Sequence, residues 1–261
     1  MLTNAKKLKG FHLLAKDGEI GHVEDFFFDD QSWTVRYLVA DTGNWLSGRL
    51  VLISPFAIAG VNCGEKLVSV NLTKKQIEDS PSIESDMPVS RHYELTYSKY
   101  YGWPLYWTGP ELWGANPFPA YTGAFDYTRA EEEPREHHID PHLRSLVNVI
   151  GYYIHARDRD IGHVHDFIVD NESWAIRYLI VDTRNWWPGK KVLLAPQWIE
   201  DISWHESHIS VDLLADAIRN APEFDESGGI TRDYEKRLYE HYNRETYWKN
   251  DYIAEPAARR D

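Results

Sequence analysis

The same unit occurs twice in the sequence. A shift of 141 positions aligns residues 10–107 with residues 151–248 without an insertion or deletion, and 36 of these 98 positions are identical. Twenty of the identities lie within the 38 positions from Gly21 to Ile58. Because a unit of about 100 residues is a normal domain size, the 261-residue chain is predicted to consist mainly of two similar domains.

Each copy is predicted to be mostly β-structure. Short runs rich in β-branched and aromatic residues alternate with polar turns, and the clearest run, WTVRYLVADT at 33–42, recurs as WAIRYLIVDT at 174–183. This strand is apolar on both faces, so both faces should be covered. Six such runs joined by tight turns predict a small closed or nearly closed barrel in each copy.

Helices are expected after the strands of each copy. Thr73 and Gln76 form a capping-box pattern, and the equivalent helix of the second copy is expected to start from Asp212. A further helix is expected after Ser90 and another after Thr231, with these residues as N-caps. The fold class is therefore mainly β, with two six-stranded barrels in tandem, each followed by helices. The predicted division is a first barrel (1–81), its appended helix (82–107), an aromatic and then charged linker (108–145), a second barrel (146–222), and a C-terminal helix and tail (223–261).

Composition excludes several classes of protein. The net charge of −13 opposes direct nucleic-acid binding, which needs clustered Lys and Arg. Cys63 is the single cysteine, so neither an internal disulfide nor a multi-cysteine zinc site is expected. The N-terminus lacks the apolar core of a secretory signal, and no run reaches the ~18 apolar residues of a membrane span. We therefore expect a cytoplasmic protein.

The pattern IGHVEDFFFDDQSWTVRYLVADTGNWLSGRLVLISP resembles a PRC-barrel domain. The matching motif residues are Gly21, Val23 and Asp25 in the first copy and Gly162, Val164 and Asp166 in the second. The resemblance covers about 70 residues of each copy, roughly 10–81 and 151–222. This family includes the cytoplasmic domain of the photosynthetic reaction-centre H subunit and the C-terminal barrel of a ribosome maturation factor. The resemblance implies a six-stranded barrel that often serves as a docking module, and it does not imply catalysis.

The resemblance leads to a functional hypothesis of a non-enzymatic adaptor or scaffold that docks protein partners. Two alternatives stay open: an H-subunit-like role in light-driven electron transfer, and a ribosome-assembly role through binding a ribosomal protein. No cofactor is expected. The partner is expected to be a protein of unknown identity, and a homo-oligomer is possible.

The His22 and Asp25 pair, repeated as His163 and Asp166, at first suggests a metal or acid/base site. Residues three apart on a strand point to opposite faces unless a bulge intervenes. A buried aspartate needs hydrogen-bond partners, so Asp25 is interpreted as a structural residue that binds backbone N–H groups and closes its barrel. No metal site is predicted, and His138, Asp140 and His142 are only weak candidates because their spacing matches no tight zinc pattern.

Aromatic residues in loops are the candidate partner-binding residues. Turn formation explains the Asp, Asn and Gly of 41–48 and 182–189 but not the adjacent tryptophans. The linker region 97–127 has 11 aromatic residues among 31, unlike ordinary polar linkers. These residues either pack within the protein or anchor a partner, since Trp is enriched in binding hot spots. The candidates are Trp45, Leu46, Trp103, Trp107, Trp113, Trp186 and Trp187.

Overall fold

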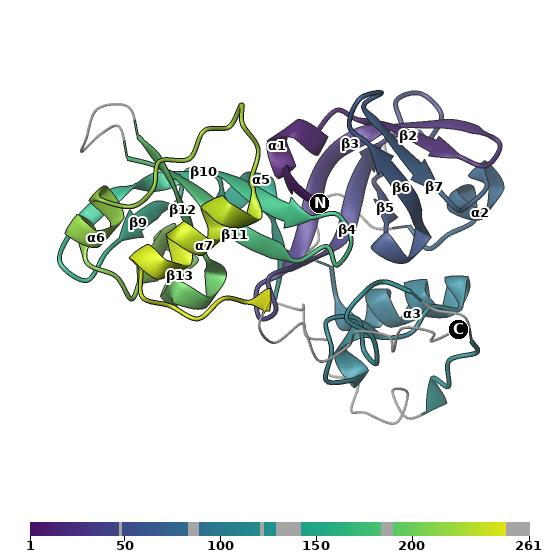
Figure 1. The fold of residues 1–261 in the computed structure, drawn as a ribbon. Coiled ribbons are helices and arrows are strands. Elements are labelled where there is room, and N and C mark those ends of the chain that lie inside the picture. Colours follow the sequence, from purple (N-terminus) through teal and green to yellow (C-terminus); the bar gives the residue numbers. More distant parts are fainter. Residues whose placement is uncertain (47–48, 83–88, 121–122, 129–141, 184–189, 249–261) are drawn as a thin grey trace, which may run out of the picture.

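The computed structural model has two β-rich lobes, one for each repeat (Figure 1). It describes residues 1–46, 49–82, 89–120, 123–128, 142–183 and 190–248. Each lobe contains a curled sheet with few helices, which confirms the predicted mainly-β class with two barrels and appended helices.

The sheet of the first lobe follows the strand order β5-β4-β3-β2-β7-β6. All neighbours are antiparallel except β2 and β7, which are parallel. The 3-10 helix η1 (Pro55–Ala57) connects the two edge strands. The strands are β2 (His12–Ala15), β3 (Gly18–Asp29), β4 (Thr34–Asp41), β5 (Val51–Ile53), β6 (Ile58–Asn62) and β7 (Leu67–Val70).

The sheet of the second lobe repeats this order as β12-β11-β10-β9-β14-β13. Its parallel pair is β9 and β14, and the 3-10 helix η3 (Pro196–Trp198) connects β12 to β13. The strands are β9 (Tyr153–His155), β10 (Asp160–Asp170), β11 (Ile176–Asp182), β12 (Lys191–Leu194), β13 (Ile199–Ser203) and β14 (His208–Val211). The gapless sequence repeat therefore corresponds to a repeated topology.

Each sheet has a seventh strand, and this strand comes from the other repeat. β1 (Leu2–Asn4) pairs with β10 of the second lobe, and β8 (Leu143–Ser145) pairs with β3 of the first lobe. A one-turn helix follows each strand, α1 (Ala5–Leu8) and α5 (Leu146–Val149). We call β1–α1 and β8–α5 the exchanged arms. This exchange was not predicted from the sequence, and residues 143–145 fall at the end of the predicted linker.

The repeats also meet through equivalent residues near one point. Thr34 and Ala175, which occupy the same position in the two copies, form an isolated antiparallel bridge. The N–H of Val35 donates to the carbonyl of Trp174 at 2.9 Å, and that of Ile176 donates to Trp33 at 2.6 Å. Equivalent residues that contact one another reciprocally indicate a local pseudo-twofold relation, as in a symmetric dimer.

Short helices follow the strands, and three of the four predicted helix starts are confirmed. Thr73 and Gln76 form the capping box of α2 (Lys74–Glu78), and Ser90 and Thr231 cap α3 (Arg91–Tyr101) and α7 (Arg232–His241). The predicted start at Asp212 is wrong, because α6 (Ala215–Arg219) begins three residues later. The Asp212 carboxylate instead binds Arg244 at 2.8 Å.

The helices α3 and α7 cover the outer faces of β4 and β11. The buried Glu94 carboxylate accepts hydrogen bonds from the hydroxyls of Tyr37 on β4 and Tyr106 in η2 (Tyr106–Thr108), both at 3.0 Å. In the second repeat, Glu235 accepts equivalent bonds from Tyr178 at 2.7 Å and Tyr247 at 2.9 Å. These helices explain why β4 and β11 are apolar on both faces.

Candidate functional site

The motif aspartates join the two repeats. The Asp25 carboxylate accepts hydrogen bonds from the hydroxyl of Ser145 and from the N–H of Val147 at 3.2 Å, both in the second repeat's arm. Asp166 accepts from the N–H of Lys6 at 3.1 Å, in the first repeat's arm, and from its neighbour Phe167 at 2.8 Å. Asp25 binds backbone N–H groups as predicted, those of Phe26 and Val147, but its partners outside β3 belong to the other repeat.

Burial shifts the titration of both motif aspartates. Loss of solvent raises the pKa of Asp25 above its usual 3.8, against the opposing effect of its hydrogen bonds. The same cause raises the pKa of Asp166, which is 1% exposed, to about 6. Both carboxylates bind the exchanged arms through hydrogen bonds, so we assign them a structural role in joining the two repeats.

The motif glycines allow close approach of neighbouring strands. Gly21 has a φ of +130°, and a Cβ there would lie 1.9 Å from the carbonyl oxygen of Asp41 on β4. Gly162 has a φ of +149° and the same relation to Asp182. The motif valines Val23 and Val164 are fully buried in the core. All six motif residues therefore have positions that build the lobes and their junction.

A hollow of about 700 Å³ lies between β13 of the second lobe and the 30–33 turn of the first lobe. We call it the β13 groove. Ile199, Ile202 and Trp204 supply apolar surface, while Glu200 and Asp201 are exposed carboxylates. Since four consecutive residues, 199–202, line it, the groove runs along the edge of the strand rather than over one face.

The charges of the β13 groove are unevenly compensated. On the wall formed by the first lobe and the second arm, Asp30 binds Arg144 at 2.9 Å, and Arg144 lies 4.2 Å above the ring of Trp204. Within the part of the chain that the structure describes, Glu200 and Asp201 have no ion-pair partner. The strand side of the groove therefore carries two uncompensated negative charges.

The equivalent hollow of the first lobe, the β6 groove, is smaller at about 390 Å³. It lies between residues 58–61 of β6 and three residues of the second repeat, Asn171, Glu172 and Trp174, and it is also lined by Phe118, Pro119 and Ala120 of the linker. The linker lines both grooves, with Phe118, Pro119 and Ala120 in the β6 groove and Leu112 in the β13 groove. Positions 259–261, which correspond to 118–120 in the repeat, lie outside the described residues.

Trp113 anchors the linker between the lobes. Its ring is 1% exposed, and its Nε1–H donates to the carbonyl of Ser173 in the second repeat at 2.8 Å. The guanidinium of Arg36 lies 4.9 Å from this ring and 3.7 Å from that of Tyr106, and it also donates to the carbonyl of Leu112. This part of the aromatic linker is packed across the junction of the repeats.

The other tryptophan candidates that the structure describes are half-buried. Trp103 is half-buried and stacks on Tyr101 at 4.3 Å, and Arg91 lies 4.3 Å above Trp107. Trp45 and Leu46 are half-buried against the core, with Lys74 located 4.5 Å above the Trp45 ring. Trp186 and Trp187 lie outside the described residues. Trp103 and the buried Trp113 both pack on Phe56, with ring centroids 5.9 and 5.1 Å away, so these two candidates belong to a packed aromatic cluster rather than to an exposed surface.

The histidines considered in the sequence analysis also lie apart. His22 contacts Asp41 at 3.6 Å rather than Asp25, and a bulge separates Val23 from Asp25. His142 contacts Asp30 at 3.2 Å. His138 and Asp140 lie outside the described residues, so the structure places only one of the three weak metal candidates.

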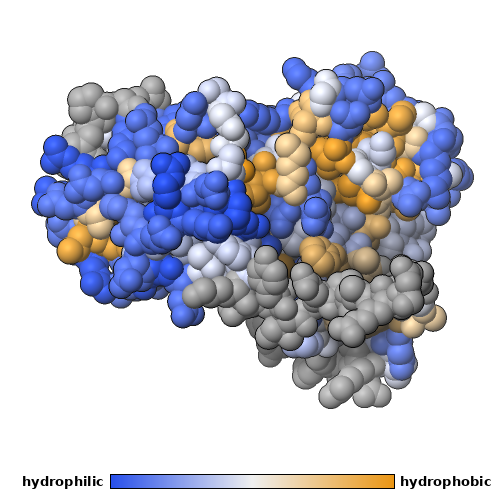
Figure 2. Space-filling view, viewed as in Figure 1, coloured by the Kyte–Doolittle hydropathy of each residue, from blue (hydrophilic) through white to orange (hydrophobic). Residues whose placement is uncertain are grey.

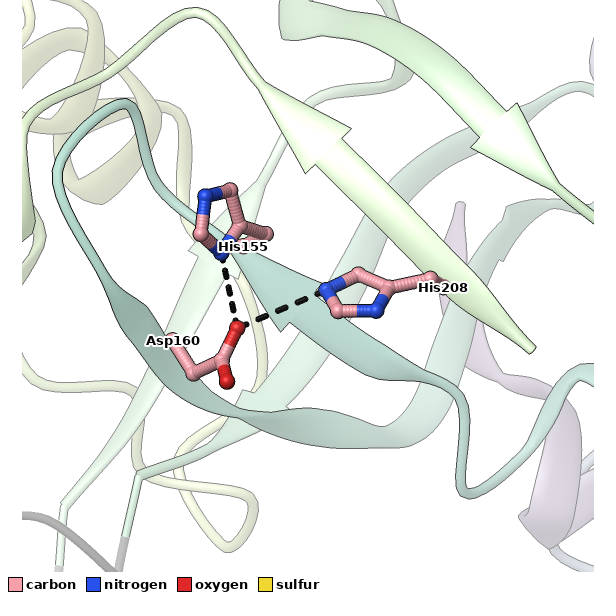
Figure 3. Close-up of side chains that lie close together, drawn as sticks. All are labelled: His155, Asp160 and His208. Atoms are coloured by element: carbon pink, nitrogen blue, oxygen red, sulfur yellow. Dashed lines mark hydrogen bonds and ion pairs between the residues drawn. The ribbon is translucent and has the colours of Figure 1, made fainter. Parts of the chain in front are cut away.

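A different cluster, which was not predicted from the sequence, brings together His155, Asp160 and His208 (Figure 3). Asp160 Oδ1 lies 2.7 Å from His155 Nδ1 and 3.4 Å from His208 Nε2. His155 and His208 are 53 positions apart in the sequence, and the parallel pairing of β9 with β14 makes them neighbours. A local spacing rule does not reveal such a pair.

The fold and its junction define a duplicated β-barrel protein with exchanged arms. The family model of the PRC-barrel domain matches residues 4–77, so the first barrel is a PRC-barrel domain, as the resemblance implied. The match does not include the second repeat, whose relation to the first rests on the 36 shared residues and the repeated topology. No curated protein sequence matches the chain significantly. None of the described helices is long and apolar enough to cross a membrane.

Proposed function

We propose that this protein is a non-enzymatic adaptor that docks an extended, basic segment of a protein partner in the β13 groove. The observation that carries the proposal is the exposed edge of β13, which lies beside a groove of about 700 Å³ and presents Glu200 and Asp201. The β6 groove of the first lobe is smaller, at about 390 Å³, and has Ala59 and Gly60 at the equivalent positions.

The edge of β13 supports binding of an extended chain. β13 pairs with β14 on one side, and no described strand pairs with its other side. A peptide that adds to such an edge forms main-chain hydrogen bonds, while pockets beside the edge select its side chains. Ile199, Ile202 and Trp204 provide the apolar part of such pockets.

Charge supports a basic partner. Glu200 and Asp201 lie on the strand side of the groove without an ion-pair partner among the described residues, and the whole chain has a net charge of −13. Figure 2 shows mainly hydrophilic residues over the second lobe in this view, whereas hydrophobic residues gather on the first. A positively charged partner would associate faster with this acidic surface, and acidic proteins would be repelled from it.

Site-resolved photo-cross-linking in the native cells tests this proposal. Gln197, which lines the groove, is replaced by p-benzoylphenylalanine, and the same replacement of the exposed Asp233 on α7 is the control. We expect a protein cross-linked from position 197 but not from position 233. Mass spectrometry of the cross-linked peptide should give a segment rich in Lys and Arg.

A charge-removal variant makes the test specific. Glu200→Gln with Asp201→Asn should weaken binding about 5- to 30-fold, because two exposed ion pairs are lost and each contributes about 0.5–1 kcal/mol. The matched control, Asp233→Asn with Glu240→Gln, removes two exposed charges from α7 and should leave binding unchanged. Equal adducts at both positions, or an acidic cross-linked segment, would contradict the proposal.

The identity of the cross-linked partner separates the alternatives. A basic ribosomal protein would assign the docking to ribosome assembly, and a component of an electron-transfer complex would assign it to an H-subunit-like role. A second copy of this chain as the sole cross-linked species would show that the groove is a self-association surface, and the adaptor proposal would then be wrong.

A further inference from the structure

The cluster of His155, Asp160 and His208 lies on three adjacent strands of the second lobe. His155 and Asp160 are directly opposite each other in the β9–β10 pair. His208 on β14 is opposite Tyr153, two residues from His155 and on the same face of the sheet. The three side chains therefore converge from a paired backbone rather than from loops (Figure 3).

We propose that His155, Asp160 and His208 bind one divalent transition-metal ion of the zinc class. Their ligand atoms, His155 Nδ1, an Asp160 oxygen and His208 Nε2, all lie within 4.8 Å of one another. Two imidazoles and one carboxylate are a donor set that zinc prefers, and three protein ligands leave a fourth position for water or another ligand. The inference goes beyond the adaptor proposal and does not depend on it.

The nitrogen of His208 gives an independent reason for a bound ion. Nε2 of His208 is enclosed and has no hydrogen-bond partner among the described residues, although Asp160 Oδ1 lies 3.4 Å away. A buried polar atom without a hydrogen bond is costly. A metal ion coordinated by His208 Nε2 and by Asp160 would remove that cost. Asp160 Oδ1 alone does not remove it, because at 3.4 Å it makes no hydrogen bond to this nitrogen.

Comparison of the repeats shows that the cluster is specific to the second lobe. The equivalent positions of the first repeat hold Leu14, Glu19 and Leu67. Both histidines thus replace leucines, and these two positions come together only through strand pairing. In the first repeat, Glu19 instead contacts His12 at 2.5 Å. The first lobe has the same strand arrangement with leucines in place of both histidines. The fold therefore accepts leucine at these two positions.

Isothermal titration with ZnCl₂ tests the site on the full chain. The variants are His155→Leu and His208→Leu, which introduce the residues of the first repeat, and Asp160→Asn, which preserves the side-chain shape. Loss of a group that merely orients a ligand costs about 10- to 100-fold in metal affinity, so loss of a ligand should cost about 100-fold or more. His92→Leu removes an exposed histidine from α3 and is the control.

We expect the wild-type chain and His92→Leu to bind one more equivalent of Zn²⁺ than any cluster variant. With Co²⁺, the visible absorption of a histidine-coordinated ion should appear in the wild type and be lost in Asp160→Asn. Circular dichroism checks that each variant is folded, and Asp160→Asn keeps the test valid if a leucine variant fails to fold. Unchanged stoichiometry and affinity in a folded cluster variant would overturn the proposal.

Discussion

Asp166 should make the stability of this protein fall as the pH rises from 5 to 7.5. Its carboxylate lies beneath the first repeat's arm, accepts the N–H of Lys6 and is 1% exposed. Burial raises its pKa from 3.8 to about 6 in the folded protein. A raised pKa means that the folded state binds the proton more tightly, so this stabilisation is complete below pH 3.8 and disappears as the pH passes through about 6.

The magnitude follows from the size of this shift. A pKa difference from 3.8 to about 6 corresponds to about 3 kcal/mol of folding free energy between the fully protonated and fully ionised limits. At pH 5, one unit below the folded pKa, about 1.4 kcal/mol of this remains, and at pH 7.5 almost none does. Asp166→Asn retains an oxygen that can accept the N–H groups of Lys6 and Phe167 but does not titrate.

Urea denaturation of the wild type and of Asp166→Asn at pH 5 and pH 7.5 measures this contribution. The free energy of unfolding of Asp166→Asn minus that of the wild type should be about 1.4 kcal/mol larger at pH 7.5 than at pH 5, because only the wild type loses stability over this range. Asp233→Asn, which removes an exposed carboxylate, controls for the change in net charge. The same pH dependence in wild type and Asp166→Asn would refute the assignment of a protonated, arm-binding Asp166.

Three further predictions concern residues that the repeats share or that join them. Gly21→Ala should destabilise the protein by at least about 2 kcal/mol in urea denaturation, because it combines a positive φ with a clash against a carbonyl of the neighbouring strand. The control Gly60→Ala should be nearly neutral, since nothing lies close to its Cβ position. Equal losses of stability in the two variants would contradict the proposed role of Gly21. Glu235→Gln should lower the free energy of unfolding by about 1–3 kcal/mol, because it removes the charged carboxylate that accepts hydrogen bonds from two tyrosine hydroxyls. The control Glu240→Gln, on the exposed side of α7, should lower it by less than about 0.5 kcal/mol. An equal loss of stability in both variants would show that the charge of Glu235 is unimportant. Trp113→Phe should cost about 1–3 kcal/mol by leaving a carbonyl of the second repeat without its donor, and an unchanged unfolding free energy would exclude the linker as a structural joint.

Local chemistry made part of this fold predictable from the sequence. Thr73, Ser90 and Thr231 cap helices as expected, because a capping residue acts on backbone N–H groups only two or three positions away. The alternation of strands and turns in each copy was predictable for the same reason. At Asp212 the rule failed, because arginines distant in the sequence bind its carboxylate.

The exchanged arms were not predictable from local patterns. β1 and β8 are three residues long, and the stability of such a strand comes from the strand it pairs with. Asp25 therefore gave a correct signal of a carboxylate that needs partners but no indication that Ser145 would provide one. The histidine cluster escaped prediction likewise, because a parallel pairing across 53 positions leaves no spacing pattern.

Differences between the repeats indicate where function is to be sought. Residues identical in both copies, such as Asp25 with Asp166 and Glu94 with Glu235, form equivalent structural contacts in the two lobes. The proposed sites lie where the copies differ: Glu200 and Asp201 replace Ala59 and Gly60, and the two cluster histidines replace leucines. Since the exchanged arms hold both lobes in one structure, each lobe can serve as an internal control for the other. Replacing a residue by its counterpart therefore tests function with the least disturbance of the fold.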